Sequence, residues 1–214
     1  MKTGKIMTAF LLASLLAGCG QSAQTTSKPD DTAEKPQETA AAQTEDLIEE
    51  TVYVEMEVEN YGTILLELDG KAAPVTVTNF VNLVNDKFYD GITFHRIMDG
   101  FMIQGGDPSG TGYGGSEKNI TGEFAQNGYD NPISHKTGTI SMARSNDPDS
   151  ARSQFFICVA DDEFLDGGYA AFGHVIEGMD VCMKIAADAK PVDNNGTIRP
   201  EEQPVITYAK VVEH

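Results

Sequence analysis

The chain has 214 residues, of which 40% are hydrophobic, enough for one folded domain with a true core and further unfolded segments. It carries 33 Asp and Glu against 15 Lys and Arg, a formal net charge of -18 at pH 7. This surplus of negative charge argues against nucleic acid and anionic lipid as electrostatic partners, because both would repel an acidic protein.

Residues 1–18 read as an export signal. Lys2 and Lys5 precede an apolar run, residues 6–16, that is too short to span a bilayer as a stable helix. Leu16-Ala17-Gly18-Cys19 then resembles the lipobox of bacterial lipoproteins, in which the signal is cut before the Cys and its sulfur is lipidated. We therefore expect an extracytoplasmic protein, anchored to the bacterial cell membrane by lipid on Cys19. The alternative is an ordinary secretory signal in which this Cys occurs by chance.

Residues 19–50 are expected to form a disordered acidic tether. They consist mainly of Gln, Ser, Thr, Ala and acids, with Pro29 and Pro36 and no aromatic residue. Such a segment cannot bury enough apolar surface to fold. The folded domain is expected over residues 51–214.

The first predicted elements of this domain are a β-hairpin and a helix. Apolar and polar residues alternate over residues 52–59 and again over 64–68, with Asn60-Tyr61-Gly62 as the turn between them. Pro74 suits the first turn of a helix, and apolar residues then recur at three- and four-residue spacing as far as Phe88. Asp90-Gly91 ends that helix.

The rest of the domain predicts a mainly β protein. Short apolar runs rich in β-branched and aromatic residues alternate with Gly, Pro, Asn and Asp clusters. The predicted strands are residues 92–97, 101–104, 139–143, 154–159, 170–176 and 205–212. One more helix is predicted over residues 179–187. Seven or eight strands, two helices and no βαβ rhythm indicate an antiparallel barrel or sandwich.

Cys158 and Cys182 could pair in an oxidising compartment, but both occupy apolar stretches that suit a small buried side chain. We favour two free, buried thiols, and we expect Phe155 in the core. No Cys or His spacing indicates a metal site.

Four blocks of sequence resemble the cyclophilin family, in family order and at family-like spacing. The first block combines Phe94-His95-Arg96-Ile97 with Gly100-Phe101-Met102-Ile103-Gln104-Gly105-Gly106-Asp107. The others are Ile140-Ser141-Met142-Ala143, Ser153-Gln154-Phe155-Phe156-Ile157, and Leu165-Asp166-Gly167 with Phe172-Gly173. The resemblance implies an eight-stranded antiparallel barrel capped by two α-helices, a groove on its outer surface, and peptidyl-prolyl cis/trans isomerase activity without a cofactor.

The resemblance also implies site residues, position by position. Arg96 falls on the essential arginine of the family, with Gln104 and Phe101 beside it as catalytic residues. The implied substrate-binding residues are Met102, Ala143, Arg144, Phe156, Phe164, Leu165 and Tyr169. Phe164 stands where tight cyclosporin binders have Trp, and Tyr169 where a His is frequent. Weak cyclosporin binding is therefore implied.

The chemistry of the reaction agrees with these residue types. Rotation about an X–Pro bond crosses a barrier of about 18–20 kcal/mol, and no bond is made or broken. A catalyst needs only to bind the twisted amide better than either planar form. The pyramidal proline nitrogen of the twisted amide accepts a hydrogen bond, and the Arg96 guanidinium is always charged and rich in donors. Taken alone, Arg96 would read as an exposed strand charge and the aromatic residues as core.

The favoured function is therefore an isomerase that acts, as a monomer, on proline-containing segments of exported proteins while they fold. A non-catalytic module that only binds such peptides is the alternative, and the intact motif residues argue against it. A solute-binding lipoprotein is disfavoured because two α/β lobes are missing. Gly110–Gly115 matches G-x-G-x-x-G, but without a βαβ unit it reads as a flexible loop beside the groove.

Overall fold

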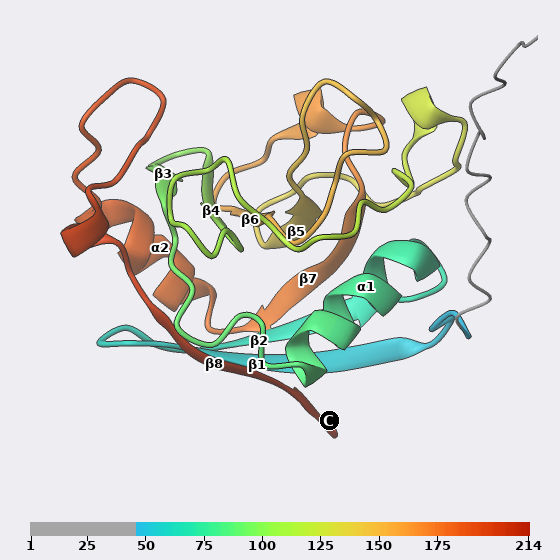
Figure 1. The fold of residues 1–214 in the computed structure, drawn as a ribbon, viewed down its shortest axis with the longest axis horizontal. Coiled ribbons are helices and arrows are strands. Elements are labelled where there is room, and N and C mark those ends of the chain that lie inside the picture. The colour runs from blue at the N-terminus through green and yellow to red at the C-terminus, as the bar shows by residue number, and fades with distance from the viewer. Residues whose placement is uncertain (1–45) are drawn as a thin grey trace, which may run out of the picture. The chain divides into compact units, whose positions relative to one another are not determined.

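The computed structural model describes residues 46–214 of the chain; the predicted signal, Cys19 and most of the tether lie outside these residues. Eight strands form one antiparallel sheet, and two α-helices pack against it (Figure 1). The strands are β1 (Thr51–Val58), β2 (Gly62–Asp69), β3 (Arg96–Met98), β4 (Met102–Gly105), β5 (Thr139–Met142), β6 (Phe155–Cys158), β7 (Ala171–Glu177) and β8 (Ile206–Val212). The helices are α1 (Pro74–Asn85) and α2 (Met179–Asp188). The fold class predicted from the sequence is confirmed.

The sheet curls until its two edges meet. Its strand order is β3-β4-β6-β5-β7-β2-β1-β8, so β3 and β8 are the edge strands. Residues 91–94, just before β3, bond to residues 204–206 at the start of β8. The Gly91 amide donates to the Ile206 carbonyl at 2.7 Å, and the Ile206 amide donates to the Ile92 carbonyl at 2.8 Å. These bonds give the sheet its barrel-like curvature and satisfy edge groups that would otherwise be open.

Three boundaries differ from the prediction. The predicted strand over residues 92–97 is regular only from Arg96, because the part before it pairs with residues 204–206. Helix α1 ends at Asn85, since Lys87 adopts a left-handed φ of 57° that a helix cannot continue. Contacts of the folded domain begin at Ile48, which packs against the core before the predicted start at residue 51.

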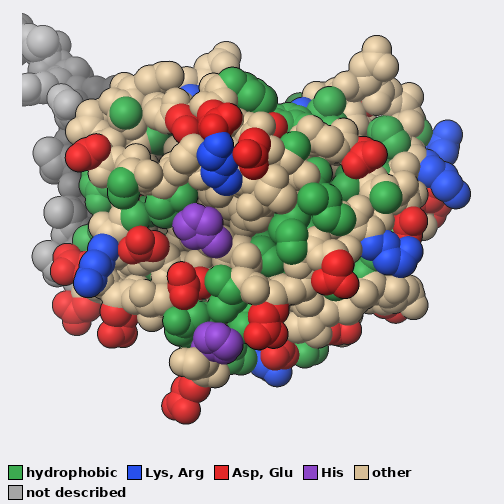
Figure 2. Space-filling view, turned by 180° about the vertical axis from the view of Figure 1, so that it is seen from behind, with side chains coloured by type: hydrophobic (Ala, Val, Ile, Leu, Met, Phe, Trp, Pro, Cys, Tyr) green, Lys and Arg blue, Asp and Glu red, His purple; other side chains and the backbone are tan. Residues whose placement is uncertain are grey.

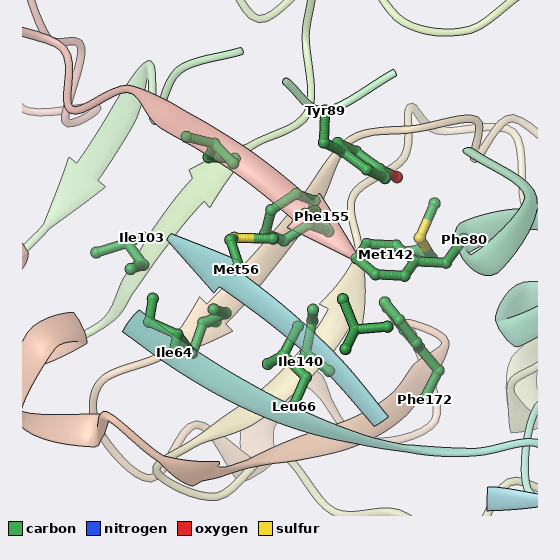
Figure 3. Packing of buried hydrophobic residues seen from close by; sticks show 14 of the residues in the cluster. Met56, Ile64, Leu66, Phe80, Tyr89, Ile103, Ile140, Met142, Phe155 and Phe172 are labelled. Atoms are coloured by element: carbon green, nitrogen blue, oxygen red, sulfur yellow. The ribbon is translucent and has the colours of Figure 1, made fainter. Parts of the chain in front are cut away.

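The main core lies between the inner face of the sheet and the two α-helices. Alternate residues of β1 and β2 are fully buried there, as the sequence alternation predicts: Val54, Met56, Val58, Ile64, Leu66 and Leu68. Phe80 of α1 meets the rings of Tyr89, Phe155 and Phe172, at centroid distances of 4.9, 5.6 and 5.1 Å (Figure 3). Rings at these distances add to the stability given by area burial. The core position predicted for Phe155 is confirmed.

Cys158 and Cys182 are both free and buried, as expected. Cys182 belongs to the main core, whereas Cys158 belongs to a second apolar cluster on the other face of the sheet. Burial raises the pKa of the Cys182 thiol to about 12. Neither α-helix among residues 46–214 is long and apolar enough to cross a membrane.

Candidate active site

Strand register sorts the motif residues onto two faces of the sheet. Arg96 of β3 lies opposite Gln104 of β4, which lies opposite Phe156 of β6. One position along, the aligned row is Ile97, Ile103, Ile157 and Ile140, all nearly or fully buried in the main core. Because successive side chains of a strand point to opposite faces, the isoleucines face inward and the row of Arg96 faces outward.

A groove of about 440 Å³ lies over this outward row. Its size is in the range of small-ligand sites. Its floor is the second apolar cluster, in which Met102, Phe156, Cys158 and Leu165 are buried and Phe101, Ala143 and Tyr169 pack around them. The full lining is His95, Arg96, Phe101, Met102, Gln104, Thr111, Gly112, Tyr113, Ala143, Arg144, Phe156, Leu165, Tyr169, Asn195 and Thr197. The structure thus brings together nine of the ten groove residues predicted from the motifs, all but Phe164.

Hydrogen bonds to two other chain segments hold the Arg96 side chain. Its Nε donates to the Asn195 carbonyl at 2.7 Å, and its Nη1 donates to Gln104 Oε1 at 3.0 Å. Two thioethers also lie close: Met98 Sδ is 3.3 Å from Nη2, and Met102 Sδ is 3.8 Å from Nη1. Sulfur is a weak acceptor, so the guanidinium is fixed in place while some of its N–H groups stay available. Partial burial lowers the pKa of Arg96, yet a guanidinium of this kind remains charged.

A chain of amides connects Arg96 to the neighbouring loop. Gln104 donates through Nε2 to Gln154 Oε1 at 3.0 Å. Gln154 in turn donates through Nε2 to the carbonyls of Gly112 and Gly114, at 3.0 and 2.8 Å. Each amide side chain therefore has its oxygen and its nitrogen engaged, which defines its orientation.

Asp107 holds that loop in place. Its buried carboxylate accepts hydrogen bonds from the backbone N–H groups of Ser109, Thr111, Gly112 and Gly114, and from the Ser109 hydroxyl. Burial opposes ionisation of this carboxyl, but the hydrogen bonds outweigh it and keep its pKa well below the usual range. The glycine-rich segment read from sequence as a flexible loop is therefore tied down at its base, and it forms one wall of the groove.

Arg144 lines the groove together with Tyr169. Its Nε and Nη2 donate to the Gly168 carbonyl at 2.9 and 2.7 Å. Its guanidinium carbon lies 4.9 Å from the ring centroid of Phe124 and 4.8 Å from that of Tyr169, within the range of cation–π contact. Tyr169 in turn meets Phe156 edge-on at 5.9 Å. The role of Arg144 and Tyr169 in binding substrate stays a prediction.

Phe164 stands apart from the other predicted groove residues. It lies in a short 3₁₀ turn, Glu163–Leu165, that directs Leu165 inward and leaves Phe164 75% exposed. Its ring is 5.6 Å from that of Phe101 but does not line the groove. Its contact with substrate stays a prediction.

Two residues next to the groove, His135 and Asn195, were not predicted from the sequence. His135 is buried behind Phe156, with the two rings stacked at 5.9 Å, and its nitrogens contact Asp166 at 2.8 Å and Ser141 at 3.0 Å. Asn195 contributes only a carbonyl, which any residue could supply, from 99 residues beyond Arg96. Neither role has a local sequence signal. The glycine-rich loop was expected beside the groove, and Thr111, Gly112 and Tyr113 line it.

No group of three or more His, Cys, Asp or Glu side chains within residues 46–214 is arranged to hold a metal ion. The groove offers instead two arginine cations, Arg96 and Arg144, together with amide groups and an apolar floor. Such a surface can bind and polarise a peptide, but it presents no paired nucleophile and base.

Comparison with known proteins agrees with this geometry. The family model for cyclophilin type peptidyl-prolyl cis-trans isomerase/CLD matches residues 53–211. The chain is 44% identical to peptidyl-prolyl cis-trans isomerase A of Dickeya dadantii over 158 residues, covering 71% of this chain and 80% of that protein. It is 46% identical to a peptidyl-prolyl cis-trans isomerase of Acinetobacter baylyi over 142 residues, covering 62% and 71% of the two chains.

Solved structures show the same relationship. A cyclophilin type peptidyl-prolyl cis-trans isomerase from Cryptosporidium parvum superimposes with a TM-score of 0.68 at 27% identity, covering 77% of this chain and 99% of that one. A structure of it in the presence of the dipeptide Ala-Pro gives a TM-score of 0.66 at 28% identity, covering 76% and 99%. The chain therefore belongs to the cyclophilin-type peptidyl-prolyl cis-trans isomerases, and the reaction it catalyses is cis/trans isomerisation of X–Pro peptide bonds.

Proposed function

We propose that this isomerase speeds the folding of exported proteins by stabilising the twisted X–Pro amide through Arg96, without covalent or acid–base chemistry. The observation that carries the proposal is the position of the Arg96 guanidinium. It lies on the outer face of the sheet, fixed by Gln104 and Asn195, directly beside an apolar floor.

The groove separates two tasks. Phe101, Met102, Phe156 and Leu165 provide apolar surface for the proline ring, which carries no N–H and gains by leaving water. Arg96 supplies the charge. The N–H groups that face only Met98 and Met102 sulfur can turn to the proline nitrogen or to a neighbouring carbonyl when the amide twists. Because other bonds already hold the guanidinium, little reorganisation is needed at that moment.

The experiment compares Arg96→Ala and Arg96→Lys with the parent in a protease-coupled isomerisation assay. By analogy with losing a preorganised donor, we expect kcat/KM of Arg96→Ala to fall on the order of a hundred- to a thousandfold, or about 3–4 kcal/mol. Lysine keeps the charge but lacks the planar fork, so it should restore only part of the activity. Both variants should bind peptide almost as well as the parent.

The melting temperature of each variant decides between outcomes. Arg96 is half-buried in an open groove, so its loss leaves no closed cavity and should shift the melting temperature by only a few degrees. Full activity in Arg96→Ala would contradict the mechanism. A variant that does not fold would make Arg96 a structural residue.

The export and anchoring part of the proposal rests on the first 19 residues of the sequence. A lipobox Cys carries a diacylglyceryl group on its sulfur. Two acyl chains give stable membrane attachment where one gives marginal binding, so anchoring should depend on Cys19. We expect Cys19→Ser to abolish labelling with a radioactive fatty acid and release the protein from membranes, with isomerase activity retained. Normal lipid labelling of this variant would show that another residue is the anchor.

A further inference from the structure

A second pocket, of about 410 Å³, adjoins the proline groove. The two share a wall made by Gln104, Gly112, Tyr113, Ala143 and Arg144. Beyond this wall the second pocket is lined by Gly114, Asn119, Ser145, Ser150, Arg152 and Gln154. An extended peptide advances about 3.3 Å per residue, so a chain with its proline in the first pocket can place a nearby side chain in the second.

The charges around these pockets have one sign. Arg144 and Arg152 are the only Asp, Glu, Lys or Arg side chains that line the second pocket, and Arg96 and Arg144 are the only ones that line the first. This is unusual in a chain with a net charge of -18, whose surface shows many acidic and few basic side chains (Figure 2).

The arginines of the two pockets differ in their partners from four other basic residues. Lys136, Lys184, Arg199 and Lys210 all form ion pairs with Asp or Glu. Within residues 46–214, no ion pair joins Arg96, Arg144 or Arg152 to a carboxylate. Their positive charge is therefore left uncompensated beside the site where substrate binds.

Arg152 is the more available of the two arginines in the second pocket. The Arg144 guanidinium already donates hydrogen bonds to the carbonyls of Gly168 and Ser145, and it contacts two aromatic rings. The guanidinium of Arg152 makes no hydrogen bond to the described residues, and it lies against Gly115, where an added Cβ would come within 3.1 Å of its Nε. A half-buried guanidinium with free donors binds a carboxylate well, because it can bond to both oxygens at once.

We propose that Arg152, supported by Arg144, makes the second pocket a subsite for an acidic side chain of the substrate. The enzyme then prefers prolyl segments that carry Asp or Glu within about three residues of the proline. This inference rests on the proposed function, because it assumes that the proline ring occupies the first pocket.

The test measures kcat/KM on peptides that are isomers of one another, with a single Glu placed at each position near the proline or at the far end. Each Glu to Gln ratio at a near position is divided by the same ratio at the far end, so that repulsion of the extra negative charge by the acidic protein as a whole cancels. Peptides with Gln or Lys at the same position complete each set. We expect one near position to favour Glu over Gln by about three- to tenfold at low salt, and the ratio to fall toward one in 1 M salt.

Three variants of the full chain locate the effect. Arg152→Gln should bring the Glu to Gln ratio close to one, and Arg152→Glu should favour the Lys peptide instead. Arg199→Gln is the matched control: it removes the same charge from an exposed residue that pairs with Glu202 and lines neither pocket, so the parent ratio should remain. Each ratio is taken within one variant, so a change in folding or enzyme concentration cancels.

The outcomes are distinct. Turnover of all peptides without a position-dependent preference, or an unchanged ratio in Arg152→Gln, would overturn the subsite and leave the isomerase function standing. A complete lack of turnover by the parent would overturn the proposed function, and the subsite with it.

Discussion

Individual residues in the groove take their roles from their neighbours. His95 and Arg96 are adjacent in the chain, yet Arg96 has partners from two other segments while both ring nitrogens of His95 lack one within residues 46–214. Burial lowers the pKa of His95, although the Asp107 charge opposes this. The two side chains therefore differ in charge at neutral pH: one is a fixed cation and the other a neutral ring.

The substitution Phe164→Trp should raise the affinity for cyclosporin. The exposed ring of Phe164 rests beside Phe101, and an indole there adds an N–H donor that phenyl lacks. The proline ring needs no such donor, so kcat/KM on peptides should change less than about threefold, well under the effect of one hydrogen bond to a charged group. Calorimetric titration of both forms with cyclosporin measures the difference. Equal affinities would mean that this turn does not contact the drug.

The loop after β4 is the element on which both pockets depend. It leaves the sheet at Gly106, whose φ of 88° is left-handed and where a Cβ would collide with the Ser153 carbonyl. Asp107 then accepts hydrogen bonds from the backbone N–H groups that follow, and Gln154 donates hydrogen bonds to two carbonyls of the same loop. Arg96, Gln104, Gln154 and this loop consequently form one connected network.

Asp107→Ala should open that network. Several N–H groups would lose a charged acceptor, which we expect to cost about 1–3 kcal/mol of stability and to lower kcat/KM. Hydrogen exchange at the amides of Gly112 and Gly114 should become faster, while amides of β1 and β2 stay protected. Asp107→Asn, which keeps one acceptor oxygen, should show a smaller effect. Unchanged exchange at Gly112 and Gly114 would mean that Gln154 alone holds the loop.

In the folded domain as a whole, the two faces of the sheet have different roles: one stabilises the fold and the other carries the groove. The inner face of the sheet forms the main core with both α-helices. The outer face of β3, β4, β6 and β5 carries the second apolar cluster and the groove. Hydrogen bonds between residues 91–94 and 204–206 connect the two ends of this curled sheet. The groove can therefore be open to peptides while the core remains closed to water.

The decrease in the free energy of unfolding at acidic pH should depend on buried histidines. Burial lowers the pKa of both His95 and His135, the latter against opposition from Asp166. Their folded pKa values lie below the unfolded value of about 6.5, so the unfolded chain takes up protons first and stability falls as pH drops below about 6.5. Carboxylates such as Asp107, whose pKa is also lowered, add losses only near pH 4 and below.

Urea unfolding at pH 7.5 and 5.5 measures this dependence. The loss of stability between these two values should be smaller in His95→Gln than in the parent. His174→Gln, which removes an imidazole from an exposed position of β7, should keep the loss seen in the parent. An identical loss in His95→Gln and the parent would show that His95 takes no part.

Much of this protein could be predicted from its sequence because local periodicity reports local environment. Alternation along β1 and β2 marked the buried row, Pro74 and helical spacing marked α1, and four motif blocks marked Arg96 and the residues of the groove floor. Each of these signals lies within a few residues of the feature that it predicts.

Tertiary structure alone decided what depends on contacts between distant segments. Three such contacts join residues that share no local pattern. They are the pairing of residues 91–94 with 204–206, the hydrogen bond from Arg96 to the Asn195 carbonyl, and the stacking of His135 behind Phe156. Arg152 belongs to the same class: its charge is visible in the sequence, but its lack of a carboxylate partner and its place in the second pocket follow from packing. A sequence pattern records which face of its own element a side chain occupies, whereas the partner across that face is set only when the sheet closes.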